Sequence, residues 1–160
     1  MTIIKSETIT GKLTHWVKPE FVECVLSGNN KLHQGIFIKP LGVWLSWNNG
    51  WEEWCESEPN FISGRICLEA KLKDGLNVWL IDSIKDFNDI WNQFDNKTEF
   101  STILIDNKFW HWLQDTYHID VVALTDKGQW ATRMNTWLYG WDCASIVVFN
   151  SKNVKFSIKK

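Results

Sequence analysis

Short apolar segments separated by turns constrain the fold of this chain more than any other feature. The range 65–72 alternates apolar and polar residues with a period of two, which is typical of a half-buried strand. Six other ranges of similar length also predict strands: Leu13–Val17, Val43–Trp47, Asn77–Ile81, Ile119–Leu124, Ser145–Phe149 and Val154–Ile158. We expect the last two to form a hairpin around a four-residue turn.

Helices are predicted between these strands. Pro19 starts a helix that Gly28 ends, and the range 50–56 forms one or two helical turns. Ser83 and Asp86 make a capping box for a third helix, whose apolar residues recur at helical spacing. Asp106 caps a fourth, which carries Phe109, Trp110 and Leu113. Strands interrupted by helices indicate an α+β fold.

Length and composition fit one soluble domain over residues 1–160, with 44% hydrophobic and 22% charged residues. The formal net charge of −2 gives no global electrostatic argument for nucleic-acid binding. The N-terminus has no apolar signal-peptide core, and no run approaches the roughly 20 apolar residues of a membrane span. We therefore expect a cytoplasmic protein that does not bind a membrane.

No metal-ligand spacing is present, because CxxC, HxxxH and HExxH patterns are all missing from the sequence. No metal site is therefore predicted. The chain also lacks GxGxxG and P-loop motifs, so nothing supports a Rossmann or NTPase interpretation. Buried free thiols are the expected state of its four cysteines, which are Cys24, Cys55, Cys67 and Cys143.

Tryptophan is concentrated in the range 39–55, where four of the twelve tryptophans of the chain fall within eleven positions. Indoles are flat and apolar, so several together line a slot for a flat aromatic ligand or fill a core. Both interpretations fit. Ser46 lies two residues after Trp44, so its hydroxyl shares a strand face with that indole.

Two further polar residues are candidates for chemistry, and each has a structural alternative. His15 lies in a predicted strand, where it either contacts a ligand or forms a structural hydrogen bond. Asp142 lies between Trp141 and Cys143, just after Gly140. It is either a carboxylate tuned by an apolar setting or a turn residue that caps backbone N–H groups.

The order of these segments resembles the ADP-ribosyltransferase superfamily, in the branch of poly(ADP-ribose) polymerase and diphtheria toxin. The resemblance spans almost the whole chain. Its pieces are Leu13-Thr-His15, Gly42-Val-Trp-Leu-Ser46, Trp54-Cys55, Ile66-Cys-Leu-Glu-Ala-Lys-Leu72, Ser145-Ile-Val-Val-Phe-Asn150 and Val154-Lys-Phe156.

The resemblance implies a small split antiparallel β-sheet core with inserted helices and a site for NAD as substrate. His15 and the backbone beside it, at Trp16, would hold the nicotinamide ribose and carboxamide. Trp44 and Trp54 would clamp the nicotinamide ring, with Ser46 assisting the carboxamide. Trp47 and Trp51 are left to packing.

The chain departs from the family at three of these positions. Trp16 stands where the family has Gly, Ser or Thr, and Trp44 where it has Tyr. Ser145 stands at the position of the family's terminal Glu, which orients the ribose and activates the acceptor. Asp142 is the nearby acid that would replace it as a catalytic residue.

Two classes of function follow. One is transfer of ADP-ribose from NAD to a protein or nucleic-acid acceptor, as in a toxin or a phage or bacterial conflict protein, with an antitoxin or inhibitor protein as a further partner. The other is a non-catalytic domain that binds NAD, ADP-ribose or a nucleobase, or a scaffold without a small ligand. A tryptophan-lined carbohydrate binder is a third alternative.

The acceptor is not identified by the sequence. Six basic residues either line a nucleic-acid path or belong to the solvated surface: Lys12, Lys18, Lys31, Lys39, Arg65 and Arg133.

Overall fold

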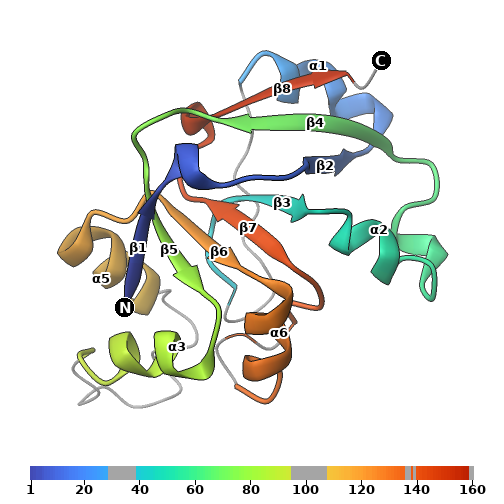
Figure 1. Cartoon of the computed structure of the whole chain (residues 1–160). Helices are drawn as coiled ribbons and strands as arrows, with labels where there is room; N and C mark the ends of the chain where they lie inside the picture. Colours follow the sequence, from blue (N-terminus) through green and yellow to red (C-terminus); the bar gives the residue numbers. More distant parts are fainter. Residues whose placement is uncertain (29–38, 95–107, 136–137, 139, 159–160) are drawn as a thin grey trace.

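The computed structural model describes residues 1–28, 39–94, 108–135, 138 and 140–158. In this part of the chain, an eight-stranded sheet in the order β1-β5-β6-β7-β3-β2-β4-β8 combines with five α-helices (Figure 1). The expected α+β class is confirmed. The strands are β1 (Thr2–Lys5), β2 (Leu13–Val17), β3 (Val43–Trp47), β4 (Ile66–Leu72), β5 (Asn77–Ile81), β6 (Val121–Leu124), β7 (Ser145–Val148) and β8 (Val154–Ile158).

The helices begin where the sequence has capping or helix-starting residues. A 3-10 turn at Pro19–Phe21 leads into α1 (Val22–Leu26), and Gly28 follows with a φ of +77°. Ser83 caps the third predicted helix by accepting a hydrogen bond from the N–H of Asp86. That helix is α3 (Ile84–Trp91), and the others are α2 (Gly50–Trp54), α5 (Lys108–Tyr117) and α6 (Asp126–Thr132). The predicted cap at Asp106 lies outside the described residues, whereas β1 and α6 were not predicted.

The strand pairing corrects two expectations. The sheet is not purely antiparallel, because β5 and β6 pair in parallel. A parallel pair needs a long crossover, and the chain from α3 to α5 separates these strands. The predicted hairpin of β7 and β8 is wrong: β7 lies between β6 and β3, while β8 pairs with β4.

The short connection between β4 and β5 shows that the sheet is not flat. β4 and β5 are five strand spacings apart in the sheet order, about 24 Å in a flat sheet. The chain has only five steps from Leu72 to Asn77, which reach about 18 Å when fully extended. The sheet must therefore curl. At the far end of the sheet β8 pairs antiparallel with β4, and next to this ladder the N–H of Lys73 donates to the carbonyl of Asn153 at 2.9 Å.

The expected split of the sheet is not observed, because β2 and β3 join all eight strands through a short junction. These strands pair through two residue pairs, Leu13 with Trp47 and Thr14 with Ser46. By contrast, β2 pairs with β4 and β3 pairs with β7 through four pairs each. Figure 1 shows β2, β4 and β8 running together along one side and β5, β6 and β7 along the other. One sheet therefore contains all eight strands, with its weakest pairing at this junction.

Each face of the sheet has its own core. Among the described residues, the cluster inside the curl consists of strand and loop residues, among them Leu45, Val78, Val121 and Ile146. The other face of β5, β6 and β7 is covered by α3 and α5, whose Phe87, Phe109 and Trp110 pack on Trp79, Val122 and Val147. A third, small cluster places α1 against β2 and β4. No helix in the described ranges is both long and apolar enough to cross a bilayer.

Candidate functional site

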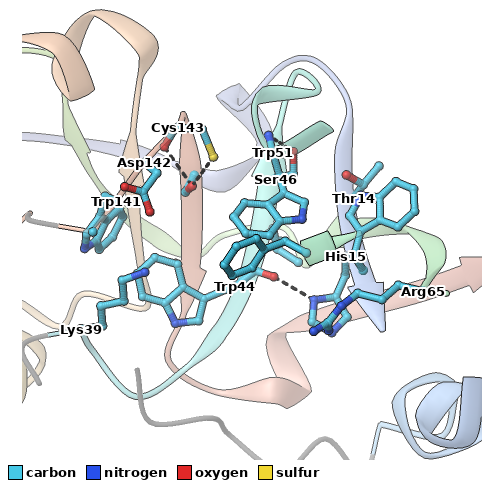
Figure 2. A pocket seen from close by; sticks show the side chains of 15 residues that line it. Thr14, His15, Lys39, Trp44, Ser46, Trp51, Arg65, Trp141, Asp142 and Cys143 are labelled. Carbon is cyan, nitrogen blue, oxygen red and sulfur yellow. Dashed lines mark hydrogen bonds between the residues drawn. The ribbon is translucent and has the colours of Figure 1, made fainter. Parts of the chain in front are cut away.

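A pocket of about 300 Å³ lies where β2 and β3 separate (Figure 2). Two of its lining residues, Trp44 and Trp141, belong to the core cluster that α3 and α5 form with the sheet. Its lining comes from segments up to 130 residues apart in the sequence. The lining residues are Thr14, His15, Trp16, Lys39, Trp44, Leu45, Ser46, Trp51, Phe61, Arg65, Gly140, Trp141, Asp142, Cys143 and Ser145. Every site residue predicted from the sequence except Trp54 is in this set.

His15 contributes to the junction that opens the pocket. Its Nδ1 lies 2.8 Å from the backbone carbonyl oxygen of Trp44. A carbonyl only accepts, so Nδ1 carries the proton in this contact. The pairing of β2 with β3 ends at Thr14 and Ser46. The His15 imidazole therefore donates to the Trp44 carbonyl in place of a backbone N–H of a paired strand. Phe156 packs against the ring, with centroids 5.3 Å apart.

Three hydroxyls form a row across the floor of the pocket. Thr14 lies opposite Ser46, and Ser46 lies opposite Ser145, on three adjacent strands. All three residues are buried. The row continues the face that carries Leu124 and Val147 beneath the helices, so the sheet surface changes from apolar to polar where the helices end. Sequence reasoning identified both serines but missed Thr14, because the pairing of β2 with β3 is not visible in the sequence.

Aromatic rings form two walls of the pocket. Trp44 meets Trp141 edge to face at 4.6 Å between centroids, and Lys39 Nζ lies 5.1 Å from the centre of the Trp44 ring. On the other side, Trp51 stacks on Trp54 at 4.8 Å with an angle of 19° between the rings. Trp51, which the sequence left to packing, lines the pocket as well as packing on Trp54, whereas Trp54 is not in the lining.

The setting of Asp142 differs from the expected apolar one. Asp142 lines the pocket but is exposed, and its backbone carbonyl accepts a hydrogen bond from Gln129 Nε2 at 3.4 Å. Lys39 is the cation nearest to it in the lining. Burial lowers the pKa of the Lys39 ammonium, and the charge of Asp142 opposes that shift.

Cys143 lies beside the hydroxyl row, with its Sγ 3.4 Å from Ser145 Oγ. The same serine hydroxyl donates to the backbone carbonyl of Cys143 at 3.0 Å. Burial raises the pKa of the Cys143 thiol to about 11, so the group stays protonated near neutral pH. A thiol in this state is not a ready nucleophile, and the geometry gives Cys143 a packing role.

Glu52 is a residue of this site that sequence reasoning missed. It lies in the first turn of α2, and its carboxylate accepts hydrogen bonds from Thr14 Oγ1 at 2.8 Å and Ser46 Oγ at 2.6 Å. Burial acts to raise the pKa of Glu52, but the hydrogen bonds from Ser46 and Thr14 outweigh it, so the pKa lies below its ordinary value. The carboxylate is therefore ionised at neutral pH.

This pKa shift predicts a pH-dependent contribution to stability. Because the folded-state pKa of Glu52 lies below the ordinary value of 4.5, its stabilisation is fully present above pH 4.5 and is lost as the pH falls through the folded value. We expect Glu52→Gln to lower the melting temperature at pH 7 and to lower it less at pH 3, which is below the ordinary value of 4.5. Thermal melts of both proteins at the two pH values measure this. An equal difference at both values contradicts it.

The remaining basic residues are scattered. Lys39 and Arg65 line the pocket, Lys12 lies 3.9 Å from the Glu52 carboxylate, and Arg133 lies over the ring of Trp130. Lys31 is outside the described residues. Among the residues that the structure describes, no group of three or more His, Cys, Asp or Glu side chains is placed to hold a metal ion.

Comparison with protein families, curated proteins and solved structures finds no match to this chain. The chemistry of the pocket therefore carries the functional argument.

Proposed function

We propose that this protein binds NAD in the pocket at the β2–β3 junction and transfers its ADP-ribose moiety to a macromolecular acceptor. The observation that carries the proposal is the convergence of His15, Trp44, Ser46 and Ser145 on one pocket. These residues belong to the segments whose order resembles the ADP-ribosyltransferases. A convergence of this kind is not required by the order of the segments alone.

The size and lining of the pocket suit the nicotinamide end of NAD. A volume of about 300 Å³ is at the lower end for small-molecule sites, so the adenosine part would extend outside. The indoles of Trp44 and Trp51 offer flat apolar surfaces to a pyridinium ring. Lys39 and Arg65 offer positive charge to the diphosphate.

The proposed reaction breaks the bond between the nicotinamide nitrogen and C1′ of the ribose. Nicotinamide leaves with the bonding electron pair as a neutral molecule. A nucleophile of the acceptor then forms a bond to C1′ and gives up its proton. The protein's part is to orient the ring and stabilise positive charge at C1′. Asp142, the carboxylate in the pocket lining, would receive this proton.

A second candidate function is non-catalytic binding of NAD or ADP-ribose in the same pocket. Ser145 favours it, because a buried hydroxyl that donates to the Cys143 carbonyl stands where the family has its catalytic glutamate. The exposed position of Asp142 favours it too, since an exposed carboxylate is well solvated.

Titration with NAD tests both functions. We expect binding to quench tryptophan fluorescence and nicotinamide to be released over time. His15→Ala should weaken binding about tenfold, equivalent to about 1.4 kcal/mol, and Asp142→Ala should slow release at least tenfold with little change in binding. His111→Ala, on the exposed side of α5, is the matched control.

The outcomes separate the candidates. Quenching without nicotinamide release supports the binding function and overturns transfer. Full turnover by Asp142→Ala refutes its assignment as the acid. No response to NAD or ADP-ribose overturns both functions.

A further inference from the structure

The Glu52 carboxylate lies directly behind the hydroxyl row. Its side chain is 20% exposed, and each of its two oxygens accepts one hydroxyl proton, from Thr14 at 2.8 Å and from Ser46 at 2.6 Å. Glu52 does not itself line the pocket, whereas both hydroxyl residues do. Glu52 therefore acts on a ligand without touching it, by directing the hydroxyls of Thr14 and Ser46 and through its negative charge.

The carboxylate fixes the direction of both hydroxyl protons. An ionised carboxylate only accepts hydrogen bonds, so Thr14 and Ser46 must each donate to it. Ser46 Oγ also accepts from the N–H of Trp51 at 3.0 Å, which leaves it one lone pair. Thr14 Oγ1 keeps two. With their protons directed away, the hydroxyls of Thr14 and Ser46 offer a ligand only hydrogen-bond acceptors.

We propose that Glu52 is a positioning residue that makes this pocket selective for a ring bearing N–H donors, such as a primary carboxamide, over the same ring bearing a carboxylate. A carboxamide N–H₂ donates to the two hydroxyl oxygens. A ligand carboxylate at the same position would face these two acceptors and the negative charge of Glu52 behind them. Because it donates no hydrogen bond, the buried hydroxyl oxygens would be left without a donor. This inference rests on the proposed function and names the part of the ligand that the floor recognises.

The cationic residues of the pocket oppose this preference for the carboxamide. Lys39 and Arg65 attract a carboxylate, but in Figure 2 their charged ends lie apart from Ser46 and Thr14. The aromatic walls contact the ring face and do not distinguish the two substituents. The selectivity therefore depends on the floor and falls when Glu52 no longer accepts both protons.

Binding of matched amide and acid ligands tests the inference. The probes are NAD against nicotinic acid adenine dinucleotide, and nicotinamide against nicotinate, measured by fluorescence or calorimetry. We expect the wild type to prefer each amide at least tenfold. Glu52→Gln should reduce that ratio to near one, because its amide N–H₂ donates to one hydroxyl and turns that hydroxyl's proton toward the ligand.

Two variants separate selectivity from a general loss of structure. Glu53→Gln neutralises the neighbouring, exposed glutamate on the same helix and should keep the wild-type ratio. Thr14→Val removes one acceptor while keeping the shape and charge of Glu52, and should lower the ratio severalfold. A ratio compares two ligands on one protein, so partial unfolding of a variant does not change it.

Each outcome bears on a different claim. If the wild type binds NAD but not more tightly than the acid form, the inference is wrong and the proposed function stands. A wild-type ratio retained by Glu52→Gln or Thr14→Val also overturns the inference. If nicotinamide is preferred over nicotinate without any NAD turnover, the inference holds and transfer fails. Failure of the wild type to bind any of the four probes overturns both.

Discussion

Replacing Trp79 with alanine is expected to destabilise the protein by about 3–5 kcal/mol. Trp79 lies in β5 with none of its surface exposed, stacked on Phe87 at 6.0 Å and edge to face with Phe109 at 6.3 Å. Removing the indole leaves a cavity between the sheet and its helices that rigid neighbours fill only partly. Equilibrium urea unfolding measures this loss of unfolding free energy. The loss is a large part of the roughly 5–15 kcal/mol that is typical of a domain.

Trp79→Phe is the matched control. Among the described residues, Trp79 Nε1 meets no hydrogen-bond acceptor although it is buried. Phenylalanine keeps a ring and removes this unsatisfied N–H, which offsets part of the lost packing, so we expect a change below about 1.5 kcal/mol. Unfolding of the two variants at the same urea concentration would contradict this expectation. So would a loss of unfolding free energy below about 1 kcal/mol for Trp79→Ala, in place of about 3–5 kcal/mol.

Gly128→Ala is expected to destabilise the protein by about 1–3 kcal/mol or more, although alanine is the better helix former. A Cβ at Gly128 would lie 2.1 Å from the backbone oxygen of Ile81. Backbone cannot swing aside as a side chain does, so α6 must move away from β5. Since Gln129 of α6 donates to the carbonyl of Asp142, the wall of the pocket should loosen as well.

Thermal melts of Gly128→Ala and Lys127→Ala test this steric argument. Lys127 is the preceding residue, and its ion pair with Asp82 at 2.8 Å joins side chains that are 76% and 41% exposed. Solvent screens such an exposed pair, so its loss costs little stability. The melting temperature should therefore fall further for Gly128→Ala. A rise, as helix propensity alone predicts, would rule out the close approach of α6 to β5.

Much of the candidate site was predictable because it depends on local spacing. Trp44 and Ser46 share a face since strand side chains alternate with a period of two, and both line the pocket. Glycine at position 42 was part of the same motif, and its reason is steric: a Cβ there would lie 2.8 Å from the backbone oxygen of Val148. The motif therefore combines a close approach of the chain at Gly42 to β7 with the candidate ligand contacts of Trp44 and Ser46.

The roles of Trp51 and Glu52 depend on geometry that spacing does not specify. Asn48 and Asn49 both adopt positive φ, at +53° and +65°, and turn the chain back so that α2 lies against β3. An Asn-Asn-Gly sequence predicts a turn, but it does not give the direction of the following helix. That direction brings Trp51 into the lining and the Glu52 carboxylate onto Ser46.

The sequence by itself determined where most elements lie and which of their side chains share a face. These properties depend on neighbours two to four residues away. The α+β class, the position of α1, the cap of α3 and the shared strand face of Trp44 and Ser46 could therefore all be predicted. Only the tertiary structure decided which strands became neighbours. The short connection from β4 to β5 forces the sheet to curl, β8 joins β4 instead of β7, and Ser145 comes opposite Ser46. Such long-range pairings depend on the packing of the whole core, which no local spacing encodes.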